Sequence, residues 1–173
     1  MINSKIHIIG LNSAGCMEND MYKKCFLWVA TLAWTMLIFL LSSQPAESSA
    51  AMSSSVLEQL LKVLPVIKNL SPDVQQQVVF WLHVIVRKMA HFSLYGVLGL
   101  LVYGLHKTYG AGGIKAIIRS LSICCLYAIS DEAHQLFVEG RGCRLYDVLI
   151  DTFGAFFGIL VAQGFLRILK KKQ

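Results

Sequence analysis

Three stretches of this sequence place ionisable side chains three, four or seven residues apart, which is the spacing of one helix face. They are Lys88-His91-Tyr95, Asp131-His134-Gln135 with Glu132 beside it, and Asp147-Asp151. An imidazole at such a site can act as a general base or as a ligand, and carboxylates can hold a divalent cation. Lysine and arginine can bind an anionic group.

The segments that must position these residues are long and apolar. Of the 173 residues, 55% are hydrophobic and only 15% are charged, which indicates a bilayer rather than water as the solvent. We predict an all-α polytopic membrane protein, a bundle of about four transmembrane helices. The predicted spans cover residues 25–41, 89–105, 116–135 and 145–166.

The remaining segments are more polar. The loop between the first two spans carries amphipathic stretches around residues 56–64 and 74–82, separated by Pro65 and Pro72, which we interpret as short interfacial helices. We expect residues 1–21 to be an unstructured cytoplasmic leader and residues 22–173 to form a single transmembrane domain.

The distribution of basic residues predicts the orientation in the cell membrane. Although the formal charge is +6, the lysines and arginines flank apolar runs and form no stripe with aromatics, so we expect no nucleic acid partner. With both termini in the cytoplasm, ten of the 16 basic residues lie inside: Lys5, Lys23, Lys24, Lys107, Lys115, Arg119, Arg167, Lys170, Lys171 and Lys172. The polar helix ends then face the extracytoplasmic side.

Depth in the bilayer makes part of this polar set a candidate site. At roughly 1.5 Å per residue, Tyr95 and Asp151 lie on the order of 10 Å below the residues that open their helices. An unpaired carboxylate there costs a few kcal/mol or more, so Asp131 and Asp151 should face the bundle and meet Lys88, His91, Arg141 or a bound ion.

Plainer roles explain other polar and small residues. For Arg87, Arg144, Glu139 and His134 we favour snorkelling or capping at the membrane surface. Gly154 and Gly158 form a GxxxG pattern, and with Gly96, Gly99 and Gly104 they indicate close helix packing. Buried packing is also the interpretation for Cys124 and Cys125.

The order of these motifs resembles the VanZ-like family of bacterial membrane proteins. The resemblance rests on Ser42-Ser43-Gln44-Pro45, Lys88-Met89-Ala90-His91-Phe92 with Tyr95, Ser130-Asp131-Glu132 with Gln135-Leu136-Phe137, Gly140-Arg141, Asp147-Val148, Asp151-Thr152 and Gly154. It covers most of residues 22–166. The resemblance implies a multi-pass protein of the cell envelope, and the family's namesake is linked to low-level resistance to the antibiotic teicoplanin. The family's polar signature falls on Lys88, His91, Tyr95, Asp131, Glu132, Gln135, Arg141, Asp147 and Asp151.

Two functional hypotheses follow. In the first, an extracytoplasmic pocket binds or modifies a lipid or cell-wall precursor, with catalytic candidates His91, Asp131, Glu132 and Asp151. The substrate-binding candidates are Lys88, Tyr95, Gln135, Arg141 and Asp147. In the second, the protein is a noncatalytic subunit whose buried ion pairs fix helix packing and whose outer loop docks a protein partner.

The sequence leaves the chemistry of the first hypothesis open, including whether the protein is an enzyme. It permits a divalent cation and requires none, and a zinc site in particular lacks any HxxxH or CxxC pattern. A transporter is disfavoured because no internal repeat is visible.

Overall fold

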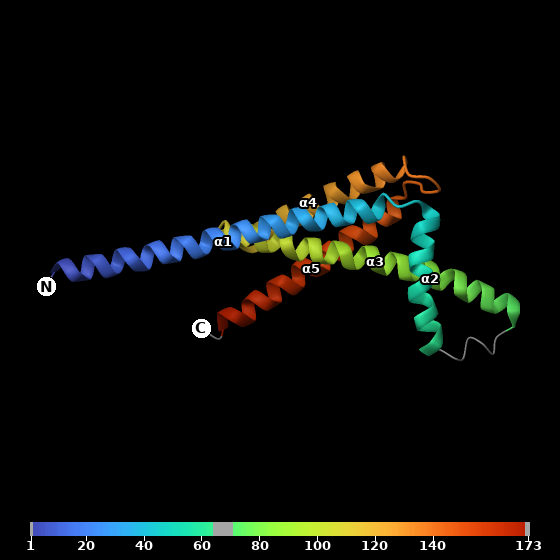
Figure 1. Ribbon diagram of the computed structural model, residues 1–173, viewed down its shortest axis with the longest axis horizontal. Helices are drawn as coiled ribbons and strands as arrows, with labels where there is room; N and C mark the ends of the chain where they lie inside the picture. The colour runs from blue at the N-terminus through green and yellow to red at the C-terminus, as the bar shows by residue number, and fades with distance from the viewer. Residues whose placement is uncertain (1, 64–70, 172–173) are drawn as a thin grey trace.

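The computed structural model describes residues 2–63 and 71–171, and over these residues every regular element is a helix (Figure 1). The helices are α1 (Ile2–Ser42), α2 (Ala46–Val63), α3 (Pro72–Thr108), α4 (Gly113–Gln135) and α5 (Leu145–Lys171). The predicted all-α class is therefore confirmed.

Four helical segments are long and apolar enough to cross a bilayer. They are Glu18–Ser42, Pro72–Thr108, Gly113–Gln135 and Leu145–Leu169. Large apolar side chains on the outside of the bundle, such as Phe26, Leu126 and Phe153, are more than 60% exposed, so only lipid can cover them. The chain is a multi-pass membrane protein.

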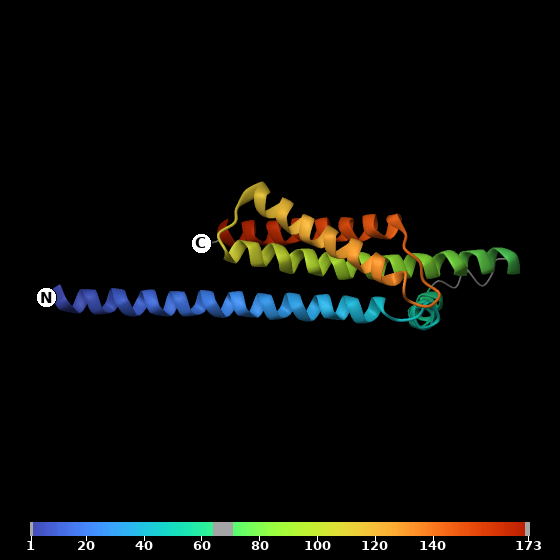
Figure 2. The ribbon, with the colours of Figure 1, turned by 90° about the horizontal axis from the view of Figure 1, so that it is seen from above.

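The functional candidates gather at one end of the bundle. Helices α1 and α4 end there and α5 begins there, and we call this end the polar end. Helix α1 begins and α5 ends at the opposite end (Figure 1). Figure 2 shows α1 on one side of the layer formed by α3, α4 and α5, and α2 crossing the polar end so that it is seen nearly along its axis.

Two helix boundaries differ from the sequence interpretation. Residues 2–21, which we expected to be an unstructured leader, form the first part of α1. The first proline of the chain is Pro45, so no proline interrupts the helix before Ser42. The stretch 74–82 is not a separate interfacial helix but the first part of α3, because no proline follows Pro72 in that helix. The stretch 56–64 does correspond to the last part of α2, except that its final residue lies outside the described residues.

Helices α3 and α5 cross at backbone contact distance. A Cβ atom built at Gly158 would collide with the carbonyl of Gly96, and one at Gly99 would collide with the carbonyl of Ala155. Close packing by the GxxxG glycines is thus confirmed for these residues. Gly104 differs, since it meets only the Leu27 side chain of α1 at an ordinary distance of 3.8 Å.

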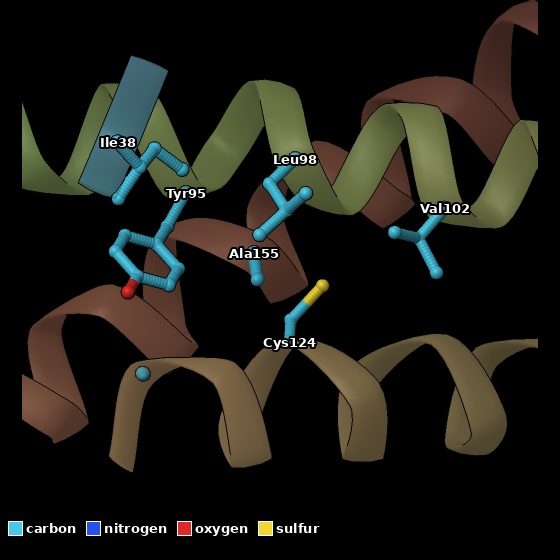
Figure 3. Packing of buried hydrophobic residues seen from close by; sticks show 7 residues of the cluster. Ile38, Tyr95, Leu98, Val102, Cys124 and Ala155 are labelled. Atoms are coloured by element: carbon cyan, nitrogen blue, oxygen red, sulfur yellow. The ribbon is translucent and has the colours of Figure 1, made fainter. Parts of the chain in front are cut away.

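A small core joins all four spanning helices near their middle. Figure 3 shows Ile38 of α1, Tyr95 and Leu98 of α3, Cys124 of α4 and Ala155 of α5 packed together, and each is almost fully buried. Burial of Cys124 agrees with its interpretation as a packing residue.

Polar side chains hold α1 against this core. The Trp34 indole donates to the carbonyl oxygen of Leu94 at 2.8 Å, and the Tyr127 hydroxyl donates to that of Thr35 at 2.6 Å. These bonds set the position of α1 along α3 and α4, and hence the place where α1 ends.

Candidate functional site

The loop between α4 and α5 shapes the polar end. Its turn includes Gly140, whose φ of +71° favours glycine, and the neighbouring Glu139 carbonyl accepts a 3.1 Å hydrogen bond from the first amide of α2 at Ala46. At the end of the loop, the backbone amide of Arg144 donates a 2.8 Å hydrogen bond to Glu132 Oε2. A side chain of α4 thus caps the start of α5. The ends of α2, α4 and α5 are therefore tied together.

A cluster of His91, Asp131 and Asp151 lies just inside this loop, one residue from each of α3, α4 and α5. Each offers a ligand atom, and these atoms all lie within 4.8 Å of one another. Asp151 is 0% exposed and Asp131 is 4% exposed. The structure thus brings together the three side chains that the depth argument selected, and we call them the triad.

The triad carboxylates have few partners. Asp131 Oδ2 accepts hydrogen bonds from the Ser42 hydroxyl at 2.8 Å and the Gln135 amide at 3.5 Å, both neutral donors. Its Oδ1 atom has no hydrogen-bond partner, and neither oxygen of Asp151 has one. The nearest charged contact of Asp151 is His91 Nδ1 at 3.7 Å.

In contrast to the triad carboxylates, the negative charge of Asp147, one helical turn before Asp151, is paired with a cation. Lys88 Nζ lies 2.5 Å from Asp147 Oδ1, which joins α3 to α5 by an ion pair at the level where α5 begins. Because the Asp147 side chain is only 18% exposed, water screens this pair only in part.

A cavity of about 80 Å³ opens above the triad, and we call it the polar cavity. Its lining is charged or polar apart from Val84 and Ile150: Arg87, Lys88, His91, Glu132, Gln135, Arg144, Asp147 and Asp151. The carboxylates of Glu132 and Asp147 already accept bonds from Arg144 N and Lys88. Among the described residues, the guanidinium groups of Arg87 and Arg144 form no ion pair.

Arg141 adds a further cation nearby. It lines a neighbouring cavity of about 200 Å³ beneath α2, together with Arg87 and His91, and its Nε atom is buried without a hydrogen-bond partner. Burial lowers the pKa of Arg141 from its usual value, and the positive charge of Arg87 lowers it further. The carboxylates of Asp131 and Glu132 act in the opposite direction and raise the Arg141 pKa, so the guanidinium stays charged and interacts with both the cation and the acids of the polar end.

An apolar groove adjoins the polar cavity on the lipid-facing side. It has a volume of about 460 Å³ between α3 and α5 and is lined by Ile85, Lys88, Met89, Phe92, Tyr146, Leu149, Ile150 and Phe153. Lys88 and Ile150 line both spaces. The groove exists because the two helices touch at their glycines and diverge from that point toward the polar end.

The predicted site residues occupy three kinds of place. His91, Glu132, Gln135, Asp147, Asp151 and Lys88 line the polar cavity, with Asp131 directly behind it through Gln135. Tyr95 is fully buried in the core, and its hydroxyl has no hydrogen-bond partner. Arg141 lies beside the cavity rather than in it.

Sequence reasoning missed three residues of the site. Ser42 belongs to a motif of the resemblance but is not among the predicted site residues, yet it is 1% exposed and donates to Asp131. Arg87 and Arg144 were interpreted as surface groups, yet both line the polar cavity. The available signals were that Ser42 belongs to a motif of the resemblance, that Arg87 directly precedes one, and that Arg144 lies between the motifs at Gly140-Arg141 and Asp147-Val148.

The comparisons with known proteins agree with the sequence motifs. A family model described as VanZ/LLP1 matches residues 27–168 of the chain. No match was found among curated proteins, and none among solved structures. The matched region begins in the first spanning segment and extends into the last turns of α5.

Proposed function

Because this chain belongs to the VanZ/LLP1 family, whose model covers residues 27–168 and so reaches into all four spanning segments, we propose that its polar end binds an anionic lipid or lipid-linked cell-envelope precursor from the extracytoplasmic leaflet. In this proposal the headgroup enters the polar cavity and an acyl or prenyl chain lies in the apolar groove. The link to glycopeptide resistance would then arise from altered handling of an envelope component.

The observation that carries the proposal is the continuity of the two spaces. A polar cavity with unpaired guanidinium groups shares Lys88 and Ile150 with a groove lined almost wholly by apolar side chains. An amphiphile has this same division between charged head and apolar tail. Guanidinium groups bind phosphate oxygens with charge-assisted hydrogen bonds, which selects an anionic head.

The alternative of a purely structural subunit has less support. It needs buried ion pairs that fix helix packing, but among the described residues only Lys88–Asp147 joins two helices through a lysine or arginine. The triad carboxylates reduce stability when left uncompensated. Such residues are expected at a functional site, where stability is given up for binding or chemistry.

Lipid selectivity of the purified protein tests the proposal. Native mass spectrometry in detergent would compare retention of phosphatidylglycerol with that of phosphatidylcholine. We expect preferential retention of the anionic lipid, and a loss of about tenfold in its affinity for Arg144→Gln, since a hydrogen bond to a charged group contributes roughly 1.5 kcal/mol or more. Arg119→Gln is the matched control, because Arg119 is exposed at the opposite end of α4. Equal retention of both lipids by the unaltered protein would reject the proposal.

The resistance phenotype tests the cellular side. Expression in a susceptible bacterium should raise the teicoplanin concentration needed to stop growth, and His91→Ala and Asp131→Asn should each abolish the rise at unchanged membrane abundance. Unaltered resistance in both variants would show that the polar end is not required for the phenotype.

A further inference from the structure

The triad beneath the polar cavity has the chemistry of a metal site. From the geometry of His91, Asp131 and Asp151, we propose that these three side chains bind a divalent metal ion of the Mn²⁺ type. The inference concerns the buried cluster itself and does not depend on which ligand the polar cavity takes.

Charge balance is the first argument. With a neutral imidazole, two ionised carboxylates leave a charge of −2 in a place that is at most 4% exposed. Among the described residues, Lys88 pairs with Asp147, but no lysine or arginine forms an ion pair with Asp131 or Asp151, and Glu132 accepts only the neutral Arg144 amide. A divalent cation supplies the missing charge, and buried charges are normally paired or bound to metal.

Unfilled hydrogen-bonding capacity is the second argument. Buried carboxylate oxygens nearly always have donors, yet Asp131 Oδ1 and both oxygens of Asp151 have none. His91 Nδ1, which points toward Asp151 Oδ1, lacks a hydrogen-bond partner too. These four atoms come from three different helices and belong to the cluster whose ligand atoms lie within 4.8 Å. Buried polar atoms without a partner also occur outside the cluster, at Tyr95, His134, Arg141 and Thr152.

The bonds that do exist are those of supported metal ligands. Ser42 and Gln135 both donate to Asp131 Oδ2, which holds the carboxylate in one orientation and leaves Oδ1 free for an ion. Ligating carboxylates in metalloproteins are themselves hydrogen-bonded in this way. Ligand atoms bound at about 2.1 Å lie roughly 3.0 Å apart when adjacent on an octahedral ion and roughly 4.2 Å apart when opposite, so the widest separation in the cluster must close by about 0.6–1.8 Å, a movement that χ rotations of the aspartates and the histidine provide.

The mixed ligand set favours Mn²⁺. Carboxylates suit Mg²⁺, Ca²⁺ and Mn²⁺, whereas mixed imidazole and carboxylate sets also bind Fe²⁺ and Zn²⁺. With two carboxylates and one imidazole we choose Mn²⁺, the transition metal of the carboxylate-preferring group. Three protein ligands leave coordination positions of the ion open. Two of these ligands, His91 and Asp151, line the polar cavity. An ion here would therefore be reached from the cavity and would present its free positions to it.

The competing explanation is a proton in place of the metal. Two neighbouring buried carboxylates can share one proton, which removes part of the charge without any ion. This explanation predicts no stoichiometric metal binding, so one measurement distinguishes the two.

Manganese binding to the full chain in detergent tests the proposal. The protein is stripped with a chelator and titrated with Mn²⁺ while the electron paramagnetic resonance signal of the free aqueous ion is followed. We expect about one ion bound per chain, and a more than 100-fold weaker affinity for Asp151→Asn and His91→Ala, because loss of a ligand should exceed the 10–100-fold effect of losing its support. Asp73→Asn, the same change at an exposed position in the first turn of α3, should bind as the unaltered protein does.

Thermal unfolding distinguishes loss of metal binding from poor folding of a variant, because the Tm is measured with and without Mn²⁺. Mn²⁺ at about 100 times its Kd should raise the apparent Tm of the unaltered protein by roughly 5–10 °C and leave that of Asp151→Asn unchanged. Without metal, Asp151→Asn should melt no lower than the unaltered protein, because it removes an uncompensated buried charge. Absence of Mn²⁺ binding, or equal binding by Asp151→Asn, would overturn the proposal.

Discussion

At the scale of single residues, the acids of the polar end differ in what compensates them. Asp147 has the ammonium of Lys88, Asp131 has the neutral donors Ser42 and Gln135, and Asp151 has only a 3.7 Å contact with His91. Compensation weakens as burial increases, from 18% exposure of the Asp147 side chain to 0% for that of Asp151. This gradient is the reverse of what stability alone would select.

The hydroxyl of Ser42 should matter more than that of its neighbour. Ser42→Ala removes a 2.8 Å hydrogen bond to the buried carboxylate of Asp131 and should lower the free energy of unfolding by about 1–2 kcal/mol. Ser43→Ala is the control, since the Ser43 hydroxyl bonds only to the Phe39 carbonyl of its own helix, and it should change stability by less than about 0.5 kcal/mol. Unfolding in detergent followed by circular dichroism measures both, and equal effects would show that the bond to Asp131 is not stabilising.

The ion pair between α3 and α5 should contribute a modest energy. A double-mutant cycle with Lys88→Gln and Asp147→Asn should give a coupling of about 1 kcal/mol, because the lysine side chain is 35% exposed and partly screened. The coupling should fall as salt concentration rises. A coupling near zero at low salt would mean that the two charges do not interact in the folded state.

Sequence spacing predicted which acids share a helix face and that His91 would meet one of them, but it did not predict that Lys88 pairs with Asp147 or that Arg144 lines the polar cavity. His91, Asp131 and Asp151 lie at positions fixed by helix geometry, so their convergence followed from depth and period. Arg144 belongs to a loop whose path depends on the positive φ of Gly140 and on a bond to the start of α2. No local pattern encodes that path.

At the scale of elements, the contact between α3 and α5 decides the shape of the site. The helices touch where Gly96 and Gly99 face Ala155 and Gly158, and above this contact they separate to leave the groove and the cavity. Small residues are thus needed at the crossing for space to exist at the polar end.

Glycine substitutions on α5 test this contact. Gly158→Ala places a methyl group against the Gly96 carbonyl and should destabilise the protein by about 1–3 kcal/mol. Gly164→Ala is the matched control, because no atom lies within 4 Å of its added Cβ, and it should be neutral or stabilising by up to about 1 kcal/mol through helix propensity. Detergent melting curves compare them, and a Gly158→Ala protein as stable as Gly164→Ala would contradict the close approach.

Hydropathy predicted the spans but not the helix ends. It marks where a segment leaves the bilayer, whereas a helix continues until a breaker or a cap stops it. Arg87 and Lys88 directly precede the predicted span 89–105, yet α3 extends through them without interruption back to Pro72. At about 1.5 Å per residue its 37 residues measure roughly 55 Å, well beyond a hydrocarbon layer of about 30 Å.

At the scale of the whole molecule, four crossings bring the start of α1 and the end of α5 to the same side of the bilayer, opposite the polar end (Figure 1). The excess of basic residues at that side predicts that it is cytoplasmic. Everything proposed for the polar end then takes place at the outer leaflet.

Cysteine labelling in intact cells tests the orientation. Cys143 is exposed in the loop of the polar end and should react with a membrane-impermeant maleimide, and Cys143→Ser should remove that labelling. In a Cys143→Ser background, Gly112→Cys at the opposite end should react only after permeabilisation, since nothing lies within 4 Å of that position. The opposite pattern would invert the topology and reject an outer-leaflet site.

The volume of the polar cavity, about 80 Å³, limits how much of any visitor the protein can inspect. One water molecule needs roughly 10–15 Å³ of volume measured in this way, so the space admits a charged group the size of a few water molecules and little else. Sugars or peptides attached beyond that group would stay in the aqueous phase and would not contact the helices. Discrimination would therefore end at the first substituent, and compounds that differ only farther out should compete on equal terms.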